Sequence, residues 1–260
     1  GVAVDMGRGA TWPGYGVLLL LFVLQQTICS ACFGDEIRVA AASNFRLAMS
    51  SLAANFERDT GHEVLLIFGS TGKHYAQIIH GAPFDAFFAA DSERPARLEQ
   101  NGLAVPATRF TYARGQLVLF RPGDSALPLD EKYLQEGNYR YLAIANPALA
   151  PYGKAALQVL ESLGLRESLK QRLVMGENVG QAYQFVFSGN AELGFVARSQ
   201  LDQQAELTGA RYWLVPAGLH QPIDQQAVLL KDTPAARDFM LYVRSDKAIT
   251  VILEHGYLTP

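Results

Sequence analysis

The sequence predicts an α/β protein of two lobes, each a mostly parallel sheet flanked by helices. The first observation is a series of three strand–helix units between Glu36 and Gly102, which is typical of a parallel sheet covered on both faces. The second is a further α/β series between Gln116 and Ala197. The third is that no spacer rich in Pro, Gly or Ser divides the two series, so we expect the chain to pass between the lobes more than once.

In the first series, each apolar strand ends at small residues, and apolar residues then recur at helical spacing. The predicted strands are Glu36 to Ala42, Val64 to Phe68 (a buried strand) and Ala86 to Ala90. The helices that follow them are predicted to end at Gly61, Gly81 and Gly102.

The second series supplies the remaining elements. Strands are predicted at Gln116 to Phe120, Tyr141 to Ala145 and Leu193 to Ala197, with helices from Pro151 to Gly164 and from Val179 to Gly189 between them. After Pro222, a strand at Gln226 to Leu230, a helix opened by Thr233-Pro234 and a last helix ending at Gly256 complete the chain. We therefore assign 35–113 and 222–260 to lobe I and 114–221 to lobe II.

The first 34 residues are predicted to be a signal peptide. Gly16 to Val23 is an apolar run too short to span a bilayer, with Arg8 before it and Cys29-Ser30-Ala31 after it. Both cysteines, Cys29 and Cys32, lie in this segment, so no disulfide is expected in the rest of the chain. Cleavage after Ala31 and lipid modification of Cys32 fit about equally well, so a lipid anchor stays open.

The overall charge excludes one class of partner. The 260 residues carry a formal net charge of −3, with no basic run. We therefore expect neither a nucleic acid nor an anionic membrane surface as a partner.

The polar residues that follow the predicted strands point to an anion site. They are Ser43-Asn44, Ser70-Thr71, Pro151-Tyr152 and Val179, each at the start of a helix. A helix N-terminus exposes unpaired N–H groups and carries about half a positive charge, so four of them aimed at one point could hold a dianion without Lys or Arg. The same residue types are ordinary N-caps, and Tyr152 could be a packing residue with its hydroxyl in water. The residues alone leave both interpretations open.

The sequence carries no positive sign of catalysis. The stretch from Gly69 to His74 resembles a phosphate-binding P-loop, but two residues instead of four separate its glycines, and His74 follows the lysine. The five histidines are scattered, and no serine lies in a nucleophile elbow. An enzyme on this scaffold would need a reactive side chain in the cleft, for which Lys73 and Lys154 are the nearest candidates.

Several stretches, in this order and spacing, resemble the periplasmic molybdate-binding proteins of bacterial ABC importers. The stretches are AAASNF (40–45), FGSTGKHYAQI (68–78), GAPFDAFFAAD (81–91), ANPALAPYGKAAL (145–157), ENVGQA (177–182) and ELGFVA (192–197). The resemblance covers about Glu36 to Pro260.

The resemblance implies a type II periplasmic-binding-protein fold, in which two lobes close by a hinge on an oxyanion, here molybdate or tungstate. The implied ligand-binding residues are Ser43, Asn44, Ser70, Tyr152 and Val179. Ser70 would donate its hydroxyl and its backbone N–H, Val179 only its N–H, and Asn44 and Tyr152 a side-chain or backbone donor. Molybdenum would enter only as molybdate bound at these residues, and no cofactor and no catalytic residue are expected.

The resemblance also implies a periplasmic location, a monomer, and the membrane permease of an ABC transporter as partner. One departure concerns the tyrosine that many members carry after a Leu-Gly-Ile-Val stretch, because Ala197 stands there in this chain. Without this tyrosine, an oxyanion is still the expected class of ligand, but the sequence does not say how well the site rejects sulfate. Sulfate is therefore the first alternative ligand. Phosphate favours a site with an acceptor carboxylate, and a ferric site would need more Tyr or His ligands than Tyr152.

Overall fold

The computed structural model describes residues 1–3, 34–123, 127–201 and 212–260. Asp35–Pro260 form one compact unit, and Gly1–Gly34 are a second unit. The predicted signal peptide, with Cys29 and Cys32, lies almost wholly outside the described residues. Within the described ranges, no helix combines the length and the apolar character that crossing a membrane requires.

A first sheet is built from both ends of the compact unit. Its described strands run in the order β2 (Glu63–Gly69), β1 (Glu36–Ala42), β3 (Ala86–Phe88), β10 (Ile223–Leu229) and β4 (Phe110–Gly115). β1 pairs in parallel with β2 and β3, as the strand–helix series predicts, whereas β10 pairs antiparallel with β3 and β4. β4 and β10 run in opposite directions because β4 leads the chain out of this sheet and β10 leads it back.

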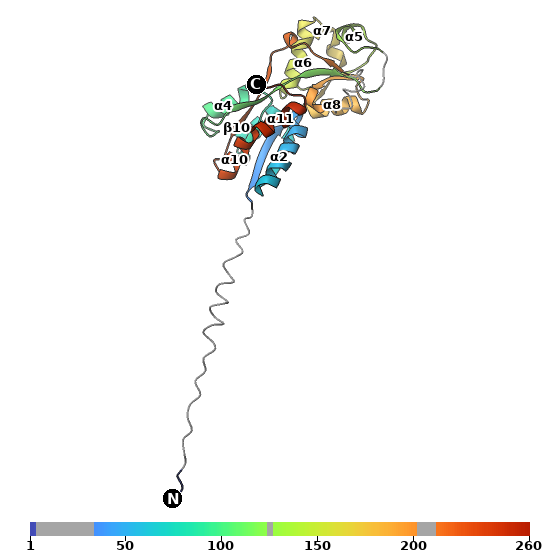
Figure 1. Ribbon diagram of the computed structural model, residues 1–260. Coiled ribbons are helices and arrows are strands. Elements are labelled where there is room, and N and C mark those ends of the chain that lie inside the picture. The colour runs from blue at the N-terminus through green and yellow to red at the C-terminus, as the bar shows by residue number, and fades with distance from the viewer. Residues whose placement is uncertain (4–33, 124–126, 202–211) are drawn as a thin grey trace. The chain divides into compact units, whose positions relative to one another are not determined.

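Helices cover both faces of this sheet (Figure 1). We call the sheet and these helices lobe I. They are α2 (Arg46–Thr60), α10 (Pro234–Val243) and α11 (Asp246–Glu254) on one face, and α3 (Thr71–Ile79) and α4 (Glu93–Gln100) on the other. Successive side chains of β1 point to opposite faces of the sheet. Val39 therefore packs in the core beneath α2, α10 and α11, and Ala40 packs in the core beneath α3 and α4. Both residues are fully buried.

The second sheet and its helices form lobe II (Figure 1). Its described strands run in the order β7 (Leu173–Gly176), β6 (Leu142–Ala145), β8 (Leu193–Ala197), β5 (Leu117–Phe120) and β9 (Tyr212–Leu214), and its described helices are α5 (Glu131–Glu136), α6 (Pro151–Ser162), α7 (Arg166–Leu169) and α8 (Val179–Phe187). β6 pairs in parallel with β7 and β8, and β5 pairs antiparallel with β8 and β9. The chain leaves lobe I after Gly115 and re-enters it at Ile223.

Some sequence-based expectations differ from the structure. The strand predicted as buried at Val64 to Phe68 is the edge strand β2, where Leu65 is 42% exposed. The strand predicted at Ala86 to Ala90 ends at Phe88, and β4, β7 and β9 were not predicted. The missed strands β4, β7 and β9 lie at sheet edges, and two of them are only three or four residues long, so their apolar pattern is too weak to stand out. The continuous apolar run of β2 is typical of a central strand, although β2 lies at the edge.

Candidate functional site

A small cavity lies where four helix starts from the two lobes converge. The space in it that is open to a water-sized group is about 10 Å³. It is lined by Ala42, Ser43, Asn44, Gly69, Ser70, Thr71, Ala90, Ala150, Pro151, Tyr152, Asn178 and Val179. All five residues that the sequence analysis selected are among them, although they span more than half of the chain.

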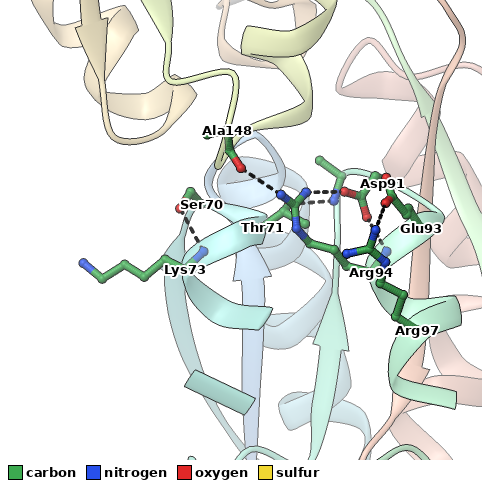
Figure 2. Close-up of polar contacts among 9 residues, drawn as sticks. Ser70, Thr71, Lys73, Asp91, Glu93, Arg94, Arg97 and Ala148 are labelled. Carbon is green, nitrogen blue, oxygen red and sulfur yellow. Dashed lines mark hydrogen bonds and ion pairs between the residues drawn. The ribbon is translucent and has the colours of Figure 1, made fainter. Parts of the chain in front are cut away.

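Ser70 presents a hydroxyl at the start of α3. It is the N-cap of this helix, with extended backbone angles, and its Oγ accepts the N–H of Lys73 at 3.2 Å (Figure 2). The side chain is buried with the cavity on its free side. Because the oxygen acts as an acceptor toward the helix, the hydroxyl proton is available to an acceptor in the cavity.

The start of α8 contributes main-chain donors from lobe II. Asn178 is the N-cap, and its Oδ1 accepts the N–H of Gln181 at 3.0 Å. Val179 is the first residue of the helix, so its own N–H has no partner within the helix. The next N–H, of Gly180, reaches across to Ser43 Oγ of lobe I at 3.3 Å. Val179 therefore offers its N–H to the cavity, and the hydroxyl proton of Ser43 can point there as well.

The side-chain donors of Asn44 and Tyr152 are already hydrogen-bonded to other residues of the protein. Asn44 Nδ2 donates to Gln225 Oε1 at 2.8 Å and to the Tyr257 hydroxyl at 2.9 Å, which uses both of its protons. The Tyr152 hydroxyl donates to the same Gln225 Oε1 at 2.8 Å. Tyr152 does pack in the core of lobe II, but the expectation that its hydroxyl lies in water is wrong, because this hydroxyl is buried and paired. Asn44 and Tyr152 can offer the cavity their backbone N–H groups.

Several contacts join the two lobes near the cavity. The N–H of Gly72 donates to the Leu149 carbonyl at 2.8 Å. Arg94 Nη2 donates to the Ala148 carbonyl at 3.0 Å (Figure 2). A Cβ on Gly72 would lie 2.9 Å from Leu149 Cα, so only glycine permits this approach. Lys73 Nζ and Glu177 Oε1 form an ion pair across the cleft at 2.9 Å.

The cavity is lined by neutral groups. None of the twelve lining residues, all of them within the described part of the chain, is an Asp, Glu, Lys, Arg or His. Burial raises the pKa of the Tyr152 hydroxyl well above its ordinary value, so it stays protonated near neutral pH. A site that combines helix N-termini with neutral donors favours a fully ionised oxyanion, because no carboxylate lies among these lining residues to accept a proton from the ligand.

The structure adds residues that the sequence analysis missed. Ser199, two residues beyond Ala197, donates its hydroxyl to the Asn44 carbonyl at 2.8 Å. Tyr257 donates to the same carbonyl at 2.8 Å. Gln225 is fully buried in β10 between the buried residues Ile223 and Ala227. A polar residue on the buried face of an alternating strand is a signal that could have singled out Gln225.

His74 couples the stability of α3 to pH. Its ring is 2% exposed, with Nε2 at 3.1 Å from the Ala41 carbonyl and Nδ1 at 3.2 Å from Gln77 Oε1. Burial lowers the pKa of His74 below the ordinary value of 6.5. The unfolded chain therefore binds a proton more readily, and the folded protein should lose stability as pH falls below about 6.5.

Replacing His74 with glutamine should remove this contribution. We expect the difference in Tm between about pH 7.5 and about pH 5.5 to be smaller in His74→Gln than in the parent. The exposed His80, at the other end of α3, supplies the control variant His80→Gln. Thermal unfolding of the three proteins tests this, and equal pH dependence in all three would contradict it.

Two α/β lobes with a small cavity of neutral donors between them define a solute-binding protein. The family model of bacterial extracellular solute-binding proteins matches residues 37–258. Molybdate-binding protein ModA of Azotobacter vinelandii is 48% identical over 233 residues, which cover 88% of this chain and 92% of that protein. ModA of Rhodobacter capsulatus is 40% identical over 227 residues, covering 86% and 88%.

A solved structure agrees with these relatives. The periplasmic molybdate-binding protein of Azotobacter vinelandii superposes with a TM-score of 0.82 at 41% identity, covering 86% of this chain and 99% of that one. The chain belongs to the bacterial extracellular solute-binding protein family. The two-lobed fold that the sequence predicts is confirmed.

Proposed function

We propose that the protein captures molybdate or tungstate outside the cytoplasm and delivers it to the membrane permease of an ABC importer. The observation that carries the proposal is the convergence of four helix starts on one small, neutral cavity in a chain 48% identical to a molybdate-binding protein. The proposed role is that of a binding protein that releases its ligand unchanged. Its periplasmic location is part of the same proposal and agrees with the relatives' names.

We assign the anion contacts to Ser43, Asn44, Ser70, Tyr152 and Val179. Ser43 and Ser70 would donate hydroxyl protons, and the other three would donate backbone N–H groups. This assignment rests on two observations. The side chains of Asn44 and Tyr152 already donate to Gln225, and Val179 lies in the first turn of α8. Such donors, held in place before the ligand arrives, favour a dianion over water without a formal positive charge.

Sulfate is the second candidate ligand. It is also fully ionised near neutral pH and needs only donors. Ala197, the last residue of β8, stands where many members of the family that the chain resembles carry a tyrosine, so one donor implied for molybdate is absent from this site. Discrimination between the two anions would therefore depend on the size of the cavity and the positions of the remaining donors.

Isothermal titration calorimetry with molybdate, tungstate, sulfate and phosphate tests the proposal. We expect tight one-to-one binding of molybdate and tungstate and much weaker binding of sulfate and phosphate. Equal or tighter binding of sulfate would replace the named ligand and keep the site. Binding of none of the four would contradict the proposed function.

A further inference from the structure

A buried polar network lies beside the cavity, where the chain crosses between the lobes. At its centre is Gln225, whose side chain is fully buried and does not line the cavity. Its Oε1 accepts two protons, one from Asn44 of lobe I and one from Tyr152 of lobe II, both at 2.8 Å. Its Nε2 donates to the Tyr112 hydroxyl at 2.8 Å, which fixes the orientation of the carboxamide.

The two donors lie in the first turns of two of the converging helices. Asn44 lies in the short helix η1 (Ser43–Phe45) that leads into α2, and Tyr152 is the second residue of α6. One oxygen atom therefore holds a helix start from each lobe. A displacement of Gln225 would move both sets of backbone N–H groups relative to each other.

The neighbouring backbone is adapted to this contact. Gly115, the last residue of β4, lies beside the Tyr152 ring, and a Cβ there would fall 2.1 Å from the Tyr152 hydroxyl. The φ angle of Gly115 is not positive, so its backbone conformation does not require glycine. Glycine is required here because a side chain would not fit. The absence of a side chain on Gly115 lets Tyr152 reach Gln225.

The main chain at Asn44 is held from both lobes as well. Its carbonyl accepts protons from Tyr257 of lobe I and from Ser199 of lobe II, each at 2.8 Å. Both protons of its side-chain amide are already donated. The network thus leaves Asn44 with a backbone N–H of fixed direction and no free side-chain donor.

We propose that Gln225 is a positioning residue for anion binding, acting through Asn44 and Tyr152. Its carboxamide oxygen sets the relative placement of the two helix starts and draws the Tyr152 hydroxyl away from the ligand. This inference rests on the proposed function, since it takes the cavity as the anion site. It differs from a direct role of the Tyr152 hydroxyl, in which that group would contact the anion itself.

A double-mutant cycle between Gln225→Met and Tyr152→Phe tests the proposal, with molybdate and sulfate affinities measured by calorimetry. Loss of one hydrogen bond corresponds to about a fivefold change in an equilibrium constant. We expect each single variant to bind about fivefold more weakly, and the double variant to be no weaker than the weaker single variant. A direct contact of the hydroxyl with the anion predicts independent losses, about 25-fold in the double variant, and would overturn the proposal.

Matched variants separate positioning from stability. Gln226→Met removes the neighbouring carboxamide, which bonds Thr111 and Arg109. Tyr139→Phe removes another buried tyrosine hydroxyl, which donates to the Leu134 carbonyl of the same lobe. Both should keep the parent affinity. A lower Tm with unchanged affinity in Gln225→Met would show a purely structural role and overturn the proposal.

A second variant covers the case in which Gln225→Met does not fold. Gln225→Asn keeps the carboxamide but is one methylene shorter, so its oxygen cannot reach both donors at once; it should also lose about fivefold in affinity. Unchanged affinity in Gln225→Asn would overturn the proposal. If the parent binds none of the four anions, both the proposed function and this inference fail, whereas a binding parent with unaffected variants overturns only the inference.

Discussion

Replacing Ser70 with aspartate is expected to lower the affinity for molybdate on the order of a thousandfold. Aspartate is as good an N-cap as serine, so α3 should keep its start. Its carboxylate would lie in the cavity beside the anion, where repulsion between two unit charges at about 4 Å amounts to about 4 kcal/mol. This energy corresponds to a factor of about 10³ in the dissociation constant. Calorimetry gives the affinity and thermal unfolding checks the fold.

The chain offers a matched control for this variant. Ser245 is the N-cap of α11, where its Oγ accepts the N–H of Ala248 at 3.3 Å, and it does not line the cavity. Ser245→Asp should leave molybdate affinity unchanged. If Ser70→Asp binds as well as the parent, the anion lies elsewhere and the assigned contacts are wrong.

Replacing Val179 with proline should weaken anion binding about tenfold to a hundredfold while keeping α8 intact. Val179 is the first residue of the helix, where proline is favoured because the N–H it lacks has no helical partner. The preceding residue, Asn178, has φ −140° and ψ 171°, an extended conformation compatible with a following proline. The variant therefore removes one N–H from the cavity, and a hydrogen bond to a charged acceptor is worth about 1.5–3 kcal/mol.

Two comparisons make this result specific. Pro151 and Pro234 already occupy the same helical position in α6 and α10, so the backbone of this fold accepts proline there. Val179→Ala shortens the side chain and keeps the N–H, so it should bind close to the parent. Equal losses in Val179→Ala and Val179→Pro would indicate a packing effect, and no loss in Val179→Pro would remove this N–H from the contacts.

The candidate site could be found from sequence because its signals are local. A strand followed by Ser43-Asn44, or by Ser70, marks a helix start, and the carboxyl ends of parallel strands meet at one edge of a sheet. Pro151-Tyr152 and Val179 follow the same logic in the second series. The structure places all of these residues around one cavity. Their role as anion contacts stays a proposal for calorimetry to test.

The signals that failed were weak or distant. β7 and β9 are four and three residues long, too short for a periodic pattern to stand out. Ser199 and Tyr257 lie far along the chain from Asn44, and no local pattern pairs a hydroxyl with a carbonyl more than 150 residues away. Gln225 lies 181 residues from Asn44, and only the pairing of β10 with β3 and β4 brings the two together.

The sequence by itself determined most of the elements, the two-lobed α/β class and the helix starts that supply donors, because caps, glycine stops and apolar periods act within a few residues. The tertiary structure decided which donors remain for a ligand. The side chains of Asn44 and Tyr152 are polar and lie at helix starts, where the sequence suggests ligand donors. In the structure, both donate to Gln225 instead. A buried polar group must find a partner, and which partner it finds depends on the packing of segments that meet only in the folded chain.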